Sequence, residues 1–213
     1  MIITYHGFSC IRLEGQKASV IIDPFDGSLG LRQPKYTADL VLLTSQEKAY
    51  SNASAVKDGV GKKPFVISGP GEYEAKGVLI YGVRPKNGLE SKKEVSTLYK
   101  LDFEKLTFAT LGRIDHNLSD TELEKLEGLD ILFVPVGGGS VMDAKQATQT
   151  ISQIEPRIVI PIQYSIKGIK EKFAEIDLFK KEIGITPEEG VAKFRIAKKD
   201  LPTDEMKVVI LSV

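Results

Sequence analysis

Short runs of consecutive apolar residues, each closed by a polar or glycine-rich turn, constrain the fold of this chain more than any other feature. The clearest run covers residues 40–43 (LVLL), and an unbroken apolar run of this length is typical of a strand buried on both faces. From Thr44 onward the chain becomes abruptly polar. In α/β sheets the ends of such strands usually carry binding or catalytic side chains, so residues 45–52 are predicted to form the functional loop.

The order of the other elements indicates the architecture. Residues 1–25 contain three closely spaced strands, which predict an antiparallel meander, whereas buried strands alternate with helices after residue 106. This pattern favours an α/β (α+β) fold in which helices lie outside two packed sheets, a four-layer αββα sandwich.

Three helices are expected in the second half of the chain. One starts at Ser119, where Glu122 lies three residues after a capping hydroxyl, and the others cover residues 142–154 and 167–183. In the last of these, the residues expected to be buried are Phe173, Ile176, Leu178 and Phe179. Two less regular features are a short polar helix within residues 45–58 and a charged hairpin tip at residues 86–93.

Length and composition limit the classes of protein. The 213 residues are expected to form a single domain over residues 1–213, from two fused half-sandwiches of approximately residues 1–105 and 106–213. No apolar run approaches the ~20 residues that span a bilayer, and no export signal is present, so a cytoplasmic protein without a membrane partner is expected. The 29 basic and 29 acidic residues balance without a long basic run, which argues against nucleic acid. The lone Cys10 is expected to be a buried thiol in a reducing compartment.

The histidine count bears directly on function. The chain has two histidines, His6 and His116. A binuclear zinc site of nitrogen and carboxylate ligands usually draws most of its ligands from imidazole. Two histidines and one cysteine cannot furnish such a site, although a single metal held with carboxylate help remains open.

Six segments carry a family pattern: residues 5–10 (YHGFSC), 21–25 (IIDPF), 38–45 (ADLVLLTS), 69–74 (GPGEYE), 134–138 (VPVGG) and 160–164 (IPIQY). Together they resemble the metallo-β-lactamase superfamily, and within it the UlaG-like or UPF0173-like branch of Zn-dependent hydrolases. The resemblance covers nearly the whole chain. It implies a metallo-β-lactamase sandwich and, in the family, zinc-dependent hydrolysis.

The resemblance also locates the family's metal ligands, and this chain carries other residues there. The His-x-His-x-Asp-His motif matches Ser45, Glu47, Ala49 and Tyr50, and the bridging aspartate that follows Leu-Gly matches Arg113. Other departures, at positions where the family or its branch has histidine, are Phe8, Arg84 and Gln163. The resemblance therefore predicts a degenerate metal site with no zinc and no other cofactor.

The charge of Arg113 suggests what fills this site. A guanidinium is a fixed positive charge, which repels a dication more strongly than a missing ligand would weaken its binding. We expect Arg113 to take over the electrostatic role of the metal by pairing with Glu47, and with Asp23 or Asp115. The alternative is that Glu47 and Lys48 simply point into solvent.

Three functional hypotheses follow. The first is a pseudoenzyme with a binding or structural role toward an unknown small molecule or protein. The second is a hydrolase of lactonase or phosphodiesterase type with a single-metal or metal-free site that uses Glu47, Asp115 and His116. The third is a subunit interface, in which another chain, for instance in a homo-oligomer, covers the cleft. His116 is expected to be a helix-entry residue with local hydrogen bonds near Ser119, with a general base as the alternative. The vestigial cleft is predicted to comprise Asp23, Ser45, Glu47, Ala49, Tyr50, Arg84, Arg113, Asp115, His116 and Gln163.

Overall fold

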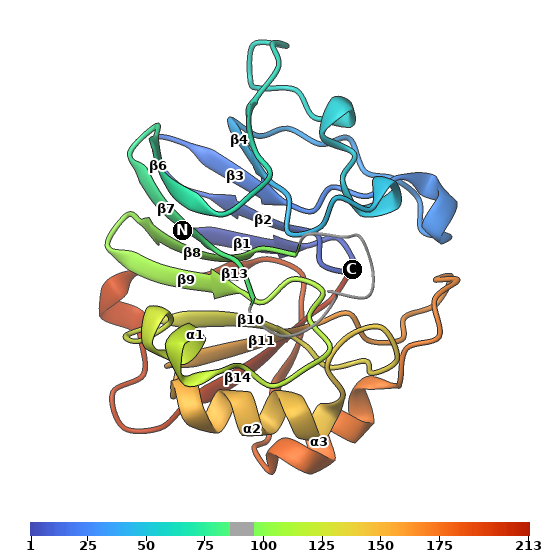
Figure 1. Ribbon diagram of the computed structural model, residues 1–213, viewed down its shortest axis with the longest axis vertical. Coiled ribbons are helices and arrows are strands. Elements are labelled where there is room, and N and C mark those ends of the chain that lie inside the picture. Colours follow the sequence, from blue (N-terminus) through green and yellow to red (C-terminus); the bar gives the residue numbers. More distant parts are fainter. Residues whose placement is uncertain (86–95) are drawn as a thin grey trace.

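The computed structural model describes residues 1–85 and 96–213, so the charged tip expected at residues 86–93 lies outside the described residues. Two sheets pack against each other, with α-helices on the outer face of one and short turns on the outer face of the other (Figure 1). The predicted α/β sandwich is confirmed, but the layer expected to hold helices outside the six-stranded sheet consists of 3₁₀ turns.

The first sheet has six strands in the order β13-β1-β2-β3-β4-β5. Their bounds are β1 Ile2–Tyr5, β2 Ile11–Glu14, β3 Ser19–Ile22, β4 Leu40–Leu42, β5 Phe65–Ile67 and β13 Phe194–Arg195. β1 to β3 form the predicted antiparallel meander, after which β4 and β5 continue parallel to β3. All three residues of β4 are buried, as the apolar run predicts.

The second sheet has eight strands in the order β12-β14-β11-β10-β9-β8-β7-β6. Their bounds are β6 Gly71–Ala75, β7 Val78–Val83, β8 Leu98–Phe103, β9 Leu106–Thr110, β10 Ile131–Pro135, β11 Ile158–Ile162, β12 Glu188–Val191 and β14 Lys207–Leu211. β6 to β9 are joined antiparallel, and β9, β10, β11, β14 and β12 run parallel. The parallel strands β10 and β11 are buried along their whole length, because they are covered on both faces.

The described residues form three α-helices: α1 Asp120–Lys125, α2 Ala144–Ile154 and α3 Ile176–Ile183. The predicted capping interaction at α1 is present, since the Glu122 carboxylate accepts hydrogen bonds at 2.6 Å from both the backbone N–H and the hydroxyl of Ser119. The helix predicted over residues 167–183 is wrong in its first half, because Gly168 adopts φ +101°. Phe179 is buried as predicted, whereas Leu178 is 58% exposed and the prediction that it is buried is wrong.

The outer face of the six-stranded sheet is covered by irregular chain with three 3₁₀ turns, η1 Gly27–Leu29, η2 Lys48–Tyr50 and η3 Ala53–Ala55. The last two replace the short helix expected within residues 45–58. They lie over a separate hydrophobic cluster that includes Phe8, Cys10, Phe25 and Tyr50. Cys10 is fully buried, as predicted, and its pKa is raised by burial.

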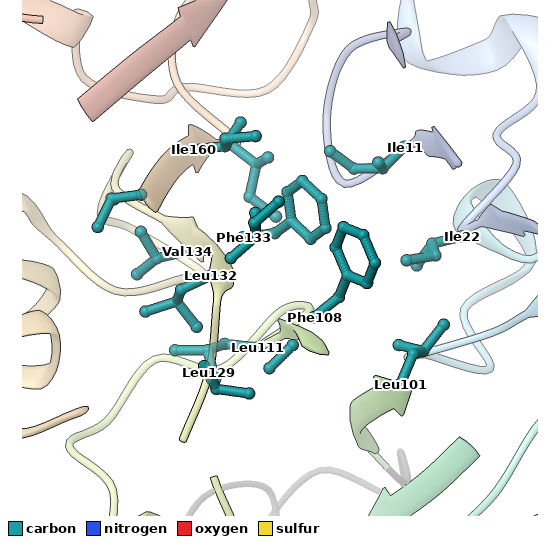
Figure 2. Packing of buried hydrophobic residues seen from close by; sticks show 14 of the residues in the cluster. Ile11, Ile22, Leu101, Phe108, Leu111, Leu129, Leu132, Phe133, Val134 and Ile160 are labelled. Atoms are coloured by element: carbon teal, nitrogen blue, oxygen red, sulfur yellow. The ribbon is translucent and has the colours of Figure 1, made fainter. Parts of the chain in front are cut away.

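The main core lies between the two sheets (Figure 2). Phe108 of β9 and Phe133 of β10 stack with their ring planes 2° apart and their centroids 6.4 Å apart. Ile11 and Ile22 face them from the six-stranded sheet (Figure 2). This close-packed interior fixes the strand ends that carry the site. Within the described residues, no helix combines the length and apolar character needed to cross a membrane.

Candidate functional site

The candidate site lies where β4 of one sheet and β9 of the other end beside each other. Gly112 follows β9 with φ +57°, and a Cβ at this position would lie 2.5 Å from the Cβ of Thr44, which follows β4. The backbone N–H of Thr97 also donates to the Thr44 carbonyl at 2.9 Å. A residue without a side chain at 112 lets the loops approach closely and places the next residue, Arg113, over the loop that follows β4.

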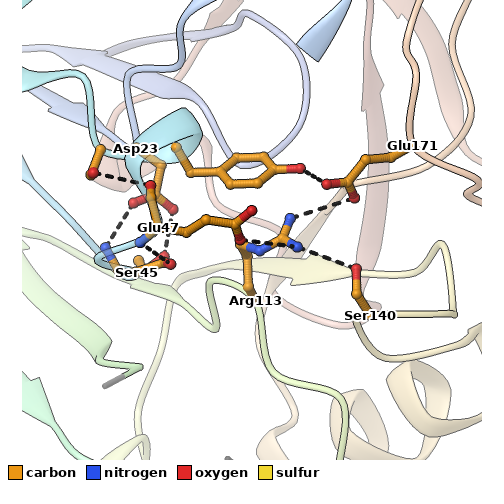
Figure 3. Close-up of polar contacts among 9 residues, drawn as sticks. Asp23, Ser45, Glu47, Arg113, Ser140 and Glu171 are labelled. Atoms are coloured by element: carbon orange, nitrogen blue, oxygen red, sulfur yellow. Dashed lines mark hydrogen bonds and ion pairs between the residues drawn. The ribbon is translucent and has the colours of Figure 1, made fainter. Parts of the chain in front are cut away.

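Arg113 is the centre of the site (Figure 3). Its side chain is 11% exposed, with Nη2 lying 3.8 Å from Glu47 Oε2 and Nη1 lying 3.6 Å from Glu171 Oε2. Nη2 also donates a hydrogen bond of 3.2 Å to the hydroxyl of Ser140. The predicted pairing of Arg113 with Glu47 is therefore present.

Two aromatic residues form the other side of the site. The guanidinium carbon of Arg113 lies 3.9 Å from the centroid of the Tyr50 ring, a cation–π contact. Tyr50 is fully buried, and its ring packs against the ring of Phe8 in a T-shaped arrangement at a centroid distance of 5.7 Å. Two positions that the resemblance assigns to metal ligands, Tyr50 and Arg113, are thus occupied by a stacked pair, and a third, Phe8, packs against it.

Glu171 is the site residue that sequence reasoning missed. It lies between β11 and α3, accepts a hydrogen bond from the Tyr50 hydroxyl, and forms the ion pair with Arg113. Burial, together with the neighbouring charge of Glu47, raises the pKa of its carboxyl group. Glu171 falls in the segment expected to be helical, where a charged residue reads as part of a solvated face, so no local signal marked it.

The carboxylate of Asp23 is bound by Thr44. It is fully buried, and its two carboxylate oxygens accept hydrogen bonds from the backbone N–H of Thr44 at 2.7 Å and from the Thr44 hydroxyl at 2.5 Å. Burial raises the pKa of Asp23 to about 6, against the lowering effects of the Thr44 hydrogen bonds and of the Arg113 charge. Asp23 therefore ties β3 to the start of the functional loop.

Asp115 and His116 form a separate pair beside the cluster. His116 Nδ1 lies 3.2 Å from Asp115 Oδ1, and the Asp115 carbonyl accepts a hydrogen bond from Gln146 Nε2 at 3.1 Å. Asp115 is thus engaged by His116 and Gln146, and its pairing with Arg113 stays a prediction. His116 makes its contact with Asp115, which precedes it, and its buried Nε2 atom has no hydrogen-bond partner among the described residues.

The remaining predicted residues lie around this centre. Ser45 is buried, and its hydroxyl accepts a hydrogen bond of 3.0 Å from the Glu47 backbone N–H. Ala49 packs against the smaller hydrophobic cluster. Gln163 follows β11 with φ +54° and is fully buried, and within the described part of the chain its amide oxygen and nitrogen have no hydrogen-bond partner. Arg84 is exposed just after β7, and no described side chain of the site contacts it through a hydrogen bond or ion pair.

The chemistry of these side chains does not fit a zinc centre. Zinc takes thiolate, imidazole or carboxylate donors at roughly 2.0–2.3 Å. The positions that the resemblance assigns to the loop motif hold a hydroxyl, a carboxylate already facing Arg113, a methyl group and a phenol. In residues 1–85 and 96–213, no group of three or more His, Cys, Asp or Glu side chains could hold a metal ion.

Comparison with known proteins assigns the chain to a superfamily. Over residues 2–163 the chain matches the family model of the beta-lactamase superfamily domain, and it therefore belongs to that superfamily. A solved structure from Thermotoga maritima, named for the Zn-dependent hydrolases of the metallo-beta-lactamase superfamily, superimposes with a TM-score of 0.81 and 28% identity, covering 99% of this chain and 97% of that one. The predicted metallo-β-lactamase sandwich is confirmed.

Curated relatives identify the branch. A UPF0173 metal-dependent hydrolase of Geobacillus sp. (strain WCH70) is 25% identical over 196 residues, which cover 78% of this chain and 86% of that protein. A UPF0173 protein of Pyrococcus abyssi (strain GE5 / Orsay) is 26% identical over 191 residues, which cover 79% and 85%. The metallo hydrolase Igni18 of Ignicoccus hospitalis shares the fold, with a TM-score of 0.64 at 21% identity and coverage of 86% and 90%. The predicted UPF0173-like branch is confirmed.

Proposed function

We propose that this protein is a metallo-β-lactamase-fold pseudoenzyme, in which an arginine-centred ion cluster replaces the zinc centre and the protein acts by binding or as a structural component. The observation that carries the proposal is the position of Arg113, between Glu47 and Glu171 and over the ring of Tyr50. A guanidinium in this place supplies the positive charge that a metal-dependent relative would draw from its ions.

Electrostatic magnitudes support this proposal. Two unit charges 4 Å apart interact by about 4 kcal/mol at an effective dielectric of 20, and a dication beside a guanidinium doubles the repulsion. Glu47 and Glu171 cannot offset that repulsion for a metal while they also neutralise Arg113. Zinc generates its nucleophile by lowering the pKa of a bound water toward ~7, and on this proposal the ion cluster does not supply that function.

Metal analysis tests the proposal. The purified chain would be dialysed against buffer with micromolar zinc and its metal content measured, with the Thermotoga maritima relative treated in parallel as the control. We expect less than about a tenth of an equivalent of zinc in this chain. Zinc bound at a true site would still be detected, because structural zinc in proteins is held by binding energies of about 10 kcal/mol or more and survives dialysis. Near one equivalent would overturn the proposal.

A second candidate function rests on Asp115 and His116. A carboxylate at Nδ1 and a buried Nε2 without a hydrogen-bond partner in the described chain form the arrangement of an oriented general base. This candidate is a hydrolase with a single-metal or metal-free site. It requires either about one equivalent of metal that is lost in His116→Ala, or metal-free hydrolysis of a lactone or phosphodiester that His116→Ala abolishes.

A further inference from the structure

A cavity of about 660 Å³ lies at the opposite end of the sandwich from Arg113. It is lined by the start of β1, the β2–β3, β6–β7 and β8–β9 turns, and the 3₁₀ turn η4 Lys198–Asp200. In Figure 1 the N-terminus and the tips of the β6–β7 and β8–β9 hairpins lie along the left side of the molecule. The five residues of β9 separate this cavity from the Arg113 site, a distance of roughly 17 Å at about 3.3 Å per residue.

Lysines dominate the charge of this cavity. Lys17, Lys76, Lys105 and Lys199 come from four different turns, and none of them forms an ion pair with a carboxylate in the described parts of the chain. A fifth lining lysine, Lys198, is committed to Asp130, with its Nζ 2.8 Å and 2.9 Å from the two carboxylate oxygens.

The acidic residue that lines the cavity is already occupied. Glu104 Oε1 accepts hydrogen bonds from the backbone N–H groups of Gln16 at 2.5 Å and Lys17 at 3.4 Å. These bonds hold the β2–β3 turn against the β8–β9 turn. The carboxylate of Glu104 therefore stabilises the turn, and its single negative charge leaves three of the four positive charges uncompensated.

Two of these lysines occupy backbone positions that favour other residues. Ala75 pairs with Val78 and Phe103 with Leu106, so both hairpins have two-residue turns. Lys76 has φ +54° and Lys105 has φ +69°, each beside a second residue with positive φ. Turns of this type strongly favour asparagine and glycine, because other side chains are strained in the left-handed region. Lysine at both positions therefore indicates a role for the charge.

The shape of the cavity favours a small ligand. A volume of about 660 Å³ lies within the ~300–1,000 Å³ of typical small-molecule sites. The buried side chains of Phe103, Leu106 and Ile196 also line it, which gives an apolar floor beneath the ring of charge. Long polyanions are attracted by extended basic surfaces, whereas this chain has a formal net charge of +0.

We propose that this cavity binds a small phosphorylated molecule that carries at least two phosphate groups on an organic body, of the chemical class of a nucleoside diphosphate. The lysines contact the phosphates, and the apolar floor contacts the organic body. This cavity is separate from the Arg113 site, so the proposal for its ligand does not depend on the metal content of the protein.

The test is calorimetric titration of the full chain with adenosine diphosphate and with inorganic pyrophosphate at low salt. The informative variant is Lys76→Asn combined with Lys105→Gly, which removes two charges and introduces residues that suit the turns. We expect this variant to have a higher melting temperature than the natural chain and to bind adenosine diphosphate about tenfold more weakly or worse, the effect of losing one or two charge-assisted hydrogen bonds. Lys76→Arg should retain binding.

Lys145→Ala, on the exposed surface of α2, is the matched control and should bind as the natural chain does. The proposal is overturned if neither probe binds at millimolar concentration, or if the double variant binds as well as the natural chain. It is also overturned if Lys145→Ala weakens binding equally, since that would indicate non-specific attraction. Tighter binding of a single-stranded oligonucleotide than of adenosine diphosphate would assign the surface to nucleic acid instead.

Discussion

The guanidinium of Arg113 and the ring of Tyr50 lie face to face, 3.9 Å from carbon to centroid, although they belong to loops that follow strands of different sheets. In the family pattern both positions carry metal ligands. A cation–π contact thus occupies two positions that carry metal ligands in the family pattern. Its contribution to the free energy of unfolding can be measured.

Removal of Arg113 should destabilise the fold. Arg113→Ala leaves the carboxylates of Glu47 and Glu171 near each other without the cation between them, and it uncovers the ring of Tyr50. Because the arginine is mostly buried while its partners are partly exposed, we expect a loss of about 1–3 kcal/mol in the free energy of unfolding, measured in urea. The control Lys207→Ala breaks an exposed pair with Glu188 and should cost less than about 1 kcal/mol. Equal effects of the two variants would show that the cluster is merely a surface ion pair.

The two carboxylates should contribute unequally. Glu171 is 24% exposed and lies 3.6 Å from the guanidinium, whereas Glu47 is 40% exposed and lies 3.8 Å away. Glu171 also accepts the hydrogen bond from Tyr50. Double-mutant cycles should therefore give a larger coupling energy for Arg113 with Glu171, about 1 kcal/mol, than for Arg113 with Glu47, about 0.5 kcal/mol. A reversed order would contradict the geometry.

The contact between Gly112 and Thr44 gives a steric prediction. Gly112→Ala places a methyl group 2.5 Å from Thr44 at a backbone position with φ +57°, so strain and overlap add. We expect a loss of about 2–4 kcal/mol in the free energy of unfolding. Gly128→Ala is the matched control, because its φ is +72° and nothing lies within 4 Å of the added carbon; it should lose only about 1 kcal/mol. Similar losses in both variants would mean that the loops separate without resistance.

Asp23 should give stability a characteristic pH dependence. Its pKa is raised to about 6 in the folded chain from an ordinary value of 3.8, so the folded state binds the proton more tightly than the unfolded state. The stability contributed by the protonated form is present below pH ~4 and is lost as the pH rises toward ~6, by an amount on the order of 3 kcal/mol. Asp23→Asn imitates the protonated form and should remove this component. Urea unfolding of both proteins at several pH values between 4 and 7 measures it, and parallel curves would refute the assignment.

Local patterns predicted much of the fold because they report local physics. The capping pair Ser119 and Glu122 needs three residues of sequence, and the buried strand at residues 40–42 needs only its apolar run. The segment before α3 departs from the predicted helix because tertiary hydrogen bonds override its helical periodicity. Lys170 N–H donates to the Leu29 carbonyl, and Ala174 N–H donates to the Gly137 carbonyl.

The part of the candidate site that could be predicted from the sequence is the ion pair of Arg113, because a buried positive charge requires a negatively charged partner. The position of Arg113 called for an acidic partner, and Glu47, nearby in the pattern, met that expectation. Glu171 lies 58 residues beyond Arg113 and approaches it only because the chain after β11 folds back over the functional loop. The residues next to Glu171 in the sequence do not indicate that the chain folds back in this way.

The convergence of loops from both sheets on Arg113 also determines what can loosen this end of the molecule. Loops held together by coordinate bonds to a metal separate when a chelator removes that metal. On the function proposed above, chelators have no effect on the contacts of Arg113, whereas high ionic strength and acid weaken them, the more exposed pair with Glu47 before the pair with Glu171. The stability of the loops around Arg113 is therefore expected to depend on the salt concentration rather than on the concentration of zinc.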